Sequence, residues 1–150
     1  MQVSNGDNTV IIAKHFTIQE LVPEHVYDER GERAWQLLDG RLILTLDALR
    51  GRFGPMIVNN WHIDKKPSWA PHERQWAGLR TEESPWGTQY SQHRHGRAAD
   101  ILFKNFTAES VREYILANPD EFPLIGSLEL GTSWFHCDTR NCDRIMTYTP

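Results

Sequence analysis

The sequence contains few cysteines and no excess of positive charge, and each shortage excludes a class of protein. Cys137 and Cys142 are too few for a disulfide framework, so the fold depends on a hydrophobic core or on a metal. The 16 Lys and Arg residues are outnumbered by 20 Asp and Glu, and no basic block is present to neutralise a phosphate backbone. We therefore expect a protein that does not bind nucleic acid.

Long hydrophobic runs are also missing. The longest apolar stretch, Leu42 to Leu49, is interrupted by Thr45 and Asp47 and is far shorter than the ~20 residues that span a bilayer. The first eight residues lack the basic and apolar regions of a secretory signal. We expect no membrane association, and cytoplasmic synthesis without a signal peptide.

The length and composition are those of one folded domain. The chain has 150 residues, of which 39% are hydrophobic and 24% charged, and this is enough to bury a core. We expect residues 1–150 to form a single domain and the protein to be a monomer.

Hydrophobic periodicity predicts two main helices. Apolar residues recur every three or four positions from Glu32 to Phe53, which predicts one helix over 32–53. Thr107 can cap a second helix that ends near Asn118. Short strands are expected at 56–58, 98–103, 124–129, 133–138 and 144–148. This order predicts an α+β fold in which helices pack on a small antiparallel sheet.

Residues 59–92 form a segment that is longer than most connections within a domain and has no sustained period. Such segments are commonly functional. Four of the six tryptophans of the chain fall within it. We expect Trp61 and Trp134 to lie in the core, whereas Trp69, Trp76 and Trp86 fit either a small core or a substrate groove.

Two histidines and an aspartate carry the chemistry that the sequence suggests. His93 and Asp100 lie seven residues apart with Gly96 between them, and His136 falls in a predicted strand far downstream. Taken alone, each histidine fits a hydrogen-bonded core residue better than a ligand. Together, two imidazoles and one carboxylate are enough for a catalytic zinc, which leaves a fourth position for water. We expect His95 to lie outside this set.

The segment from Ser91 to Asp100 resembles the zinc D-alanyl-D-alanine carboxypeptidases and L-alanyl-D-glutamate endopeptidases. This family includes phage endolysins and cell-wall peptidases, and hedgehog signalling domains share its fold. Its pattern Ser-x-His-x-x-Gly-x-Ala-x-Asp is matched by Ser91, His93, Gly96, Ala98 and Asp100. A looser resemblance covers residues 57–140. The resemblance implies a hedgehog/D-Ala-D-Ala peptidase-like fold and a Zn2+ ion bound by His93, Asp100 and His136.

The resemblance leaves the catalytic base open. Better known members carry a glutamate three residues before the last histidine, where this sequence has Ser133. Asp138 can substitute, because alternation along a strand points His136 and Asp138 to the same face. Glu129, at the end of the preceding predicted strand, can reach the site across a hairpin. We favour Asp138, since some cell-wall members share its His-x-Asp ending.

Arg80 follows Gly78 and Leu79 in the place where the family has an arginine near the substrate carbonyl. A guanidinium at this position can hold the developing oxyanion or a terminal carboxylate through paired hydrogen bonds. An ordinary loop arginine in a salt bridge explains the residue equally well.

With this resemblance, the sequence predicts a zinc metallopeptidase that hydrolyses a peptide bond involving a D-amino acid in peptidoglycan. Its expected partner is the peptidoglycan stem peptide. A phage or prophage enzyme, delivered to the cell wall by a holin, by lysis or by a virion, fits the missing secretory signal. The alternative is a non-catalytic binding or virion structural module that keeps the fold. Ser133 favours this alternative, because zinc polarises water but does not move its proton.

Overall fold

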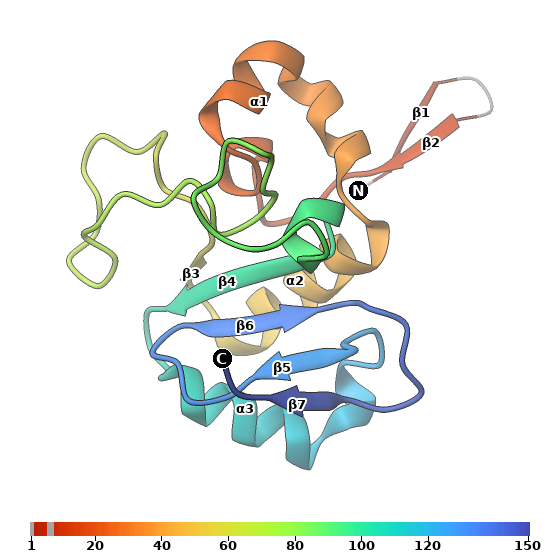
Figure 1. Cartoon of the computed structure of the whole chain (residues 1–150), viewed down its shortest axis with the longest axis vertical. Coiled ribbons are helices and arrows are strands. Elements are labelled where there is room, and N and C mark those ends of the chain that lie inside the picture. The colour runs from red at the N-terminus through yellow and green to blue at the C-terminus, as the bar shows by residue number, and fades with distance from the viewer. Residues whose placement is uncertain (1, 6–7) are drawn as a thin grey trace.

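The fold is built around a five-stranded sheet with the strand order β3-β4-β6-β5-β7. The computed structural model describes residues 2–5 and 8–150. The strands of the sheet are β3 (Met56–Ile57), β4 (Ala98–Phe103), β5 (Ser127–Glu129), β6 (Phe135–Asp138) and β7 (Met146–Tyr148). Helix α2 (Gly40–Phe53) packs against β4, and α3 (Ala108–Ala117) packs against β4 and β6 (Figure 1). The prediction of an α+β fold with helices against a sheet is confirmed.

The remaining elements were mostly not predicted. They are β1 (Gln2–Asn5), β2 (Asn8–Ile11), η1 (Ile18–Glu20), α1 (Glu24–Arg30), η2 (Gly31–Leu37), η3 (Gln92–His95) and η4 (Pro119–Glu121). Within residues 2–5 and 8–150, strands β1 and β2 pair only with each other, as a hairpin that projects beside α1 in Figure 1. In the part of the chain that the structure describes, no helix has the length and apolar character needed to cross a bilayer.

The sheet is mixed, so the prediction of an antiparallel sheet is wrong for one pairing. The pairs β3–β4, β4–β6 and β5–β6 are antiparallel, but β5 and β7 are parallel. Strand β6 already has β4 on one side and β5 on the other, so β7 cannot pair with β6. The chain therefore crosses the end of β5 and adds β7 to its free edge. Because β7 runs opposite to β6, it runs parallel to β5.

The helix predicted over 32–53 is divided in two. Helix η2 ends at Leu37 and α2 begins at Gly40. Between them, the Asp39 carboxylate accepts a hydrogen bond from the backbone N–H of Arg41 at 2.8 Å and so caps α2. The backbone N–H of Asp39 donates to the carbonyl of Gly96 at 2.9 Å. This tertiary contact, which periodicity cannot reveal, ties the break to the turn that carries His93.

The long segment after β3 contains no helix or strand until η3, but buried polar side chains hold it in place. The Asn59 side chain is fully buried, donates to the carbonyl of Val22 at 3.1 Å and accepts from the backbone N–H of Ala77 at 3.0 Å. The Arg74 guanidinium donates to the carbonyl of Val58 and to that of Asp100, both at 2.9 Å. The segment is therefore attached to the strand that carries the predicted aspartate ligand.

Both cysteines are free thiols. Cys137 is fully buried in β6, on the face opposite His136 and Asp138, as strand alternation predicts. Burial raises the pKa of its thiol. Cys137 is therefore a core residue, whereas Cys142 is exposed.

Candidate metal centre

The three predicted ligands meet because two of them are direct partners across the sheet. Asp100 of β4 and His136 of β6 stand opposite each other in the antiparallel register, so their side chains share one face. His93 comes from η3, and the chain then turns into β4 at Gly96, whose φ of 66° is in the left-handed region. A Cβ at Gly96 would lie 2.2 Å from the carbonyl oxygen of Leu37, so only glycine fits there. This explains the glycine of the motif.

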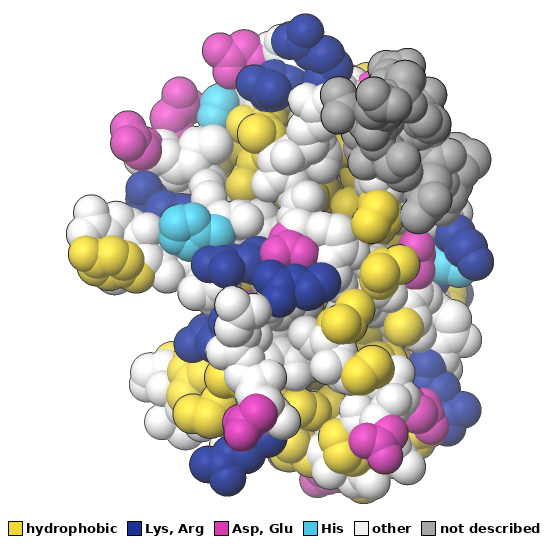
Figure 2. All heavy atoms as spheres, turned by 90° about the vertical axis from the view of Figure 1, so that its right-hand side faces the viewer, with side chains coloured by type: hydrophobic (Ala, Val, Ile, Leu, Met, Phe, Trp, Pro, Cys, Tyr) yellow, Lys and Arg dark blue, Asp and Glu magenta, His cyan; other side chains and the backbone are white. Residues whose placement is uncertain are grey.

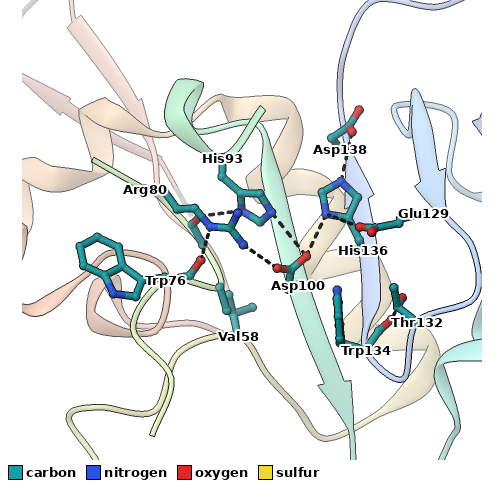
Figure 3. Close-up of polar contacts among 12 residues, drawn as sticks. Val58, Trp76, Arg80, His93, Asp100, Glu129, Thr132, Trp134, His136 and Asp138 are labelled. Carbon is teal, nitrogen blue, oxygen red and sulfur yellow. Dashed lines mark hydrogen bonds and ion pairs between the residues drawn. The ribbon is translucent and has the colours of Figure 1, made fainter. Parts of the chain in front are cut away.

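The ligand atoms of His93, Asp100 and His136 all lie within 4.8 Å of one another (Figure 3). Asp100 Oδ1 is 2.8 Å from His136 Nδ1 and 3.4 Å from His93 Nε2. The two histidine side chains are buried and the aspartate is partly buried. This His-Asp-His group can hold a metal ion.

A backbone carbonyl orients the first histidine. His93 Nδ1 lies 2.8 Å from the carbonyl oxygen of Gly78. Because a carbonyl only accepts, Nδ1–H donates, which leaves the lone pair of His93 Nε2 directed at Asp100. A Cβ at Gly78 would lie 2.3 Å from the carbonyl oxygen of Leu21, so the segment that orients His93 is closely packed.

Three carboxylates lie near His136, one on the Nε2 side of its ring and two on the Nδ1 side. His136 Nε2 is 3.2 Å from Asp138 Oδ2, whereas Nδ1 faces Asp100 and is 3.9 Å from Glu129 Oε2. Figure 3 shows Asp138 on the side of the ring away from Asp100 and Glu129. The predicted shared face of His136 and Asp138 is confirmed, but Asp138 lies on the Nε2 side of the imidazole ring, away from Asp100. Glu129 reaches the group from β5, because it is the register partner of His136.

A cleft of about 800 Å³ opens over the group. Its lining includes four aromatic residues and several charged ones: Glu73, Arg74, Trp76, Arg80, Trp86, His93, Asp100, Glu129, Trp134, His136 and Tyr148. Asp138 is absent from the described residues that line the cleft, and its side chain is fully buried. Besides the predicted ligand Asp100, Glu129 is therefore the carboxylate in the described part of the chain that both lines the cleft and lies beside His136.

Arg80 lines the cleft and also makes the salt bridge that was its alternative explanation. Its Nη2 atom donates to Asp100 Oδ2 at 2.9 Å, on the carboxylate oxygen that does not contact the histidines. Its Nε atom donates to the carbonyl of Trp76 at 2.7 Å. These contacts fix the guanidinium at the edge of the His-Asp-His group.

Asp100 and His136 shift each other's pKa values. Burial by itself raises the pKa of the Asp100 carboxyl, but the hydrogen bond from His136, together with the neighbouring His93 ring, outweighs burial and holds this pKa below its usual range. For His136, burial lowers the pKa, yet hydrogen bonds with Asp100 and Asp138 outweigh burial and raise the pKa to about 9. Without a metal, the group is therefore a carboxylate with an imidazolium at neutral pH.

Two further sequence predictions have clear outcomes. His95 is exposed in η3 and lies outside the His-Asp-His group, as expected. Trp134, which was expected in the core, is 38% exposed and lines the cleft, so that prediction is wrong. The residue before it, Ser133, is exposed in the β5–β6 turn, and the register of this hairpin leaves both residues outside the strands.

Sequence reasoning missed a buried arginine that supports the site from behind. Arg112 is 2% exposed, and its guanidinium donates to the carbonyls of Thr132 at 2.8 Å, Trp134 at 3.1 Å and Glu129 at 3.3 Å. It thereby holds the β5–β6 turn together with Glu129, the last residue of β5. A signal was present, because Arg112 falls on the buried stripe of α3 with Ala108, Val111 and Ile115.

Comparison with known proteins adds no relative. No protein-family model, curated protein or solved structure matches this chain. The resemblance to zinc cell-wall peptidases therefore depends on the motif residues and on the looser likeness over residues 57–140.

Proposed function

We propose that this protein is a zinc-dependent peptidase that hydrolyses a peptide bond involving a D-amino acid in peptidoglycan. The supporting observation is the convergence of His93, Asp100 and His136 in a cleft, with the Glu129 carboxylate beside them. The motif resemblance supports the choice of peptidoglycan.

The donor set fits zinc. Two imidazole nitrogens and one carboxylate oxygen are the ligand types and the number that a catalytic zinc site takes from the protein. Zinc bound by these residues would act as a Lewis acid and lower the pKa of a coordinated water.

The side chains of the cleft supply the remaining chemistry. Glu129 Oε2 accepts the proton of the attacking water and later passes it to the leaving amine. Better known members of the family have a glutamate three residues before the last histidine, where this chain has Ser133. Here Glu129 takes over the role of that glutamate. The guanidinium of Arg80 stabilises the negative charge that develops on the carbonyl oxygen.

The exposed aromatic lining of the cleft, whose volume is about 800 Å³, favours a polymer over a free dipeptide. Trp86 is 63% exposed and Trp134 is 38% exposed, so aromatic surface is available to an extended substrate.

We expect one zinc ion per chain and release of peptides from purified peptidoglycan. Metal analysis of the native protein measures the first, and mass spectrometry of the digest identifies the bond from the new termini. Chelation should stop the release and added zinc should restore it. Zinc-loaded protein that cuts no peptidoglycan type would support the non-catalytic module, and protein that takes up no zinc would overturn the proposal.

Zinc binding should release about one proton per ion below pH 9, because the imidazolium of His136 must give up its Nδ1 proton. The affinity for zinc should therefore rise about tenfold per pH unit as the pH approaches 9. The raised pKa also stabilises the metal-free protein fully below pH 6.5, and this contribution is lost as the pH rises through 9. Calorimetry in two buffers of different ionisation enthalpy measures the proton release. An identical heat in both buffers at neutral pH would contradict this expectation.

A further inference from the structure

We propose that Asp138, clamped by Arg140, is a positioning residue that fixes which nitrogen of His136 faces the metal. This inference rests on the metal site of the proposed function. The sequence favours Asp138 as the catalytic base, whereas this inference gives it the role of orienting His136.

The contacts of Asp138 leave it no route to a substrate. Its side chain is fully buried, and Arg140 binds both carboxylate oxygens, with Nε donating to Oδ1 at 2.8 Å and Nη2 to Oδ2 at 2.6 Å. Oδ1 also accepts from the backbone N–H of Arg140 at 3.3 Å, and Oδ2 contacts His136 Nε2 at 3.2 Å. Each oxygen thus has two partners on this side of the sheet.

The same contacts determine the protonation of the ring. A carboxylate only accepts, so His136 Nε2 carries a proton, and the lone pair available to a metal is the one on Nδ1. Nδ1 is the ring nitrogen that faces Asp100, and both residues line the cleft.

Asp138 becomes more important once a metal is bound. In the metal-free group, the ring is held from both sides, at Nδ1 by Asp100 and at Nε2 by Asp138. When Nδ1 and Asp100 both become ligands, their hydrogen bond is lost. The hydrogen bond to Asp138 then remains to orient the ring, as a carboxylate behind a ligating histidine does in other zinc sites.

Arg140 holds this carboxylate in place. Its bidentate geometry restricts the Asp138 carboxylate to one plane, and its guanidinium lies 5.6 Å from the ring centre of Tyr148, which lines the cleft. The three side chains come from β6, the loop that follows it and β7. The clamp therefore links the back of the metal site to the edge of the sheet.

The test measures zinc affinity in the full chain by competition with a chromogenic chelator. Asp138→Asn should weaken zinc binding by about 10-fold to 100-fold, and Arg140→Gln should weaken it less, because the acceptor remains. Asp120→Asn, which removes the same charge from an exposed position in η4, should leave the affinity unchanged. If Asp138→Asn does not fold, the zinc affinity of Arg140→Gln decides the test.

A second measurement separates positioning from a purely structural role. In the zinc-loaded wild type, nitrogen NMR of His136 should show a metal-bound Nδ1 and a slowly exchanging Nε2 proton, and both variants should speed up that exchange. Wild-type affinity and exchange in the variants would overturn the inference. So would an Asp138→Asn protein that binds zinc normally but has a low kcat, because Asp138 would then be the base. A wild type that binds no zinc is a different result, and it overturns the proposed function itself.

Discussion

Replacing Glu129 with glutamine is expected to slow peptidoglycan hydrolysis by roughly 100-fold to 10,000-fold while zinc stays bound. The amide keeps the size of the side chain but cannot accept a proton from water. Glu129 lies 3.9 Å from His136 and faces the cleft, so it is placed to move protons without being a ligand in the His-Asp-His group. Peptide release measured at saturating zinc separates this loss from any loss of metal.

The matched control for this variant is Glu113→Gln, which makes the same change at an exposed position of α3. It should retain wild-type activity. If Glu129→Gln is fully active while Asp138→Asn is inactive with zinc bound, the base is Asp138. Full activity in both variants would remove carboxylate base catalysis from the mechanism.

The second large effect is expected from His136→Ala, which should lose both zinc and hydrolysis. The substitution leaves two of the three proposed metal ligands, and it removes the hydrogen-bond partner that Asp100 and Asp138 share. His95→Ala, at an exposed position near the site, should keep nearly all of both properties. Metal content and peptide release are measured on protein whose circular dichroism shows it to be folded. An equal loss in the two variants would mean that the ligand set is wrong.

Local sequence patterns were sufficient where neighbouring residues decide the structure. The strand predicted at 98–103 matches β4, and the cap predicted at Thr107 precedes α3, where its side chain accepts from the N–H of Ser110 at 3.1 Å. The grouping of His93, Asp100 and His136 was predicted from residue types and from the motif. These features depend on spacing within a short segment or on a ligand set that a metal requires.

Tertiary contacts decided the features that sequence reasoning could not reach. The break at Asp39 depends on a hydrogen bond to Gly96, more than fifty residues away in the chain, and the parallel pairing of β7 depends on which sheet edge is free. Strand alternation correctly placed Asp138 on the face of His136. It could not show which side of the imidazole ring the carboxylate would meet, because that depends on the clamp by Arg140.

Because Asp100 and His136 pair directly across β4 and β6, binding of the proposed metal ion would depend on correct strand register. A slip of the two strands by one residue would turn one ligand to the opposite face of the sheet and separate the pair. Only the native pairing brings His93, Asp100 and His136 together, so a zinc ion held by them would stabilise that pairing by mass action and would stabilise no shifted one. Amide hydrogen exchange in β4 and β6 should therefore slow when zinc is added, and the amides of the distant β1–β2 hairpin should respond least. A chain whose β4 and β6 were paired out of register would therefore fail to bind the metal ion.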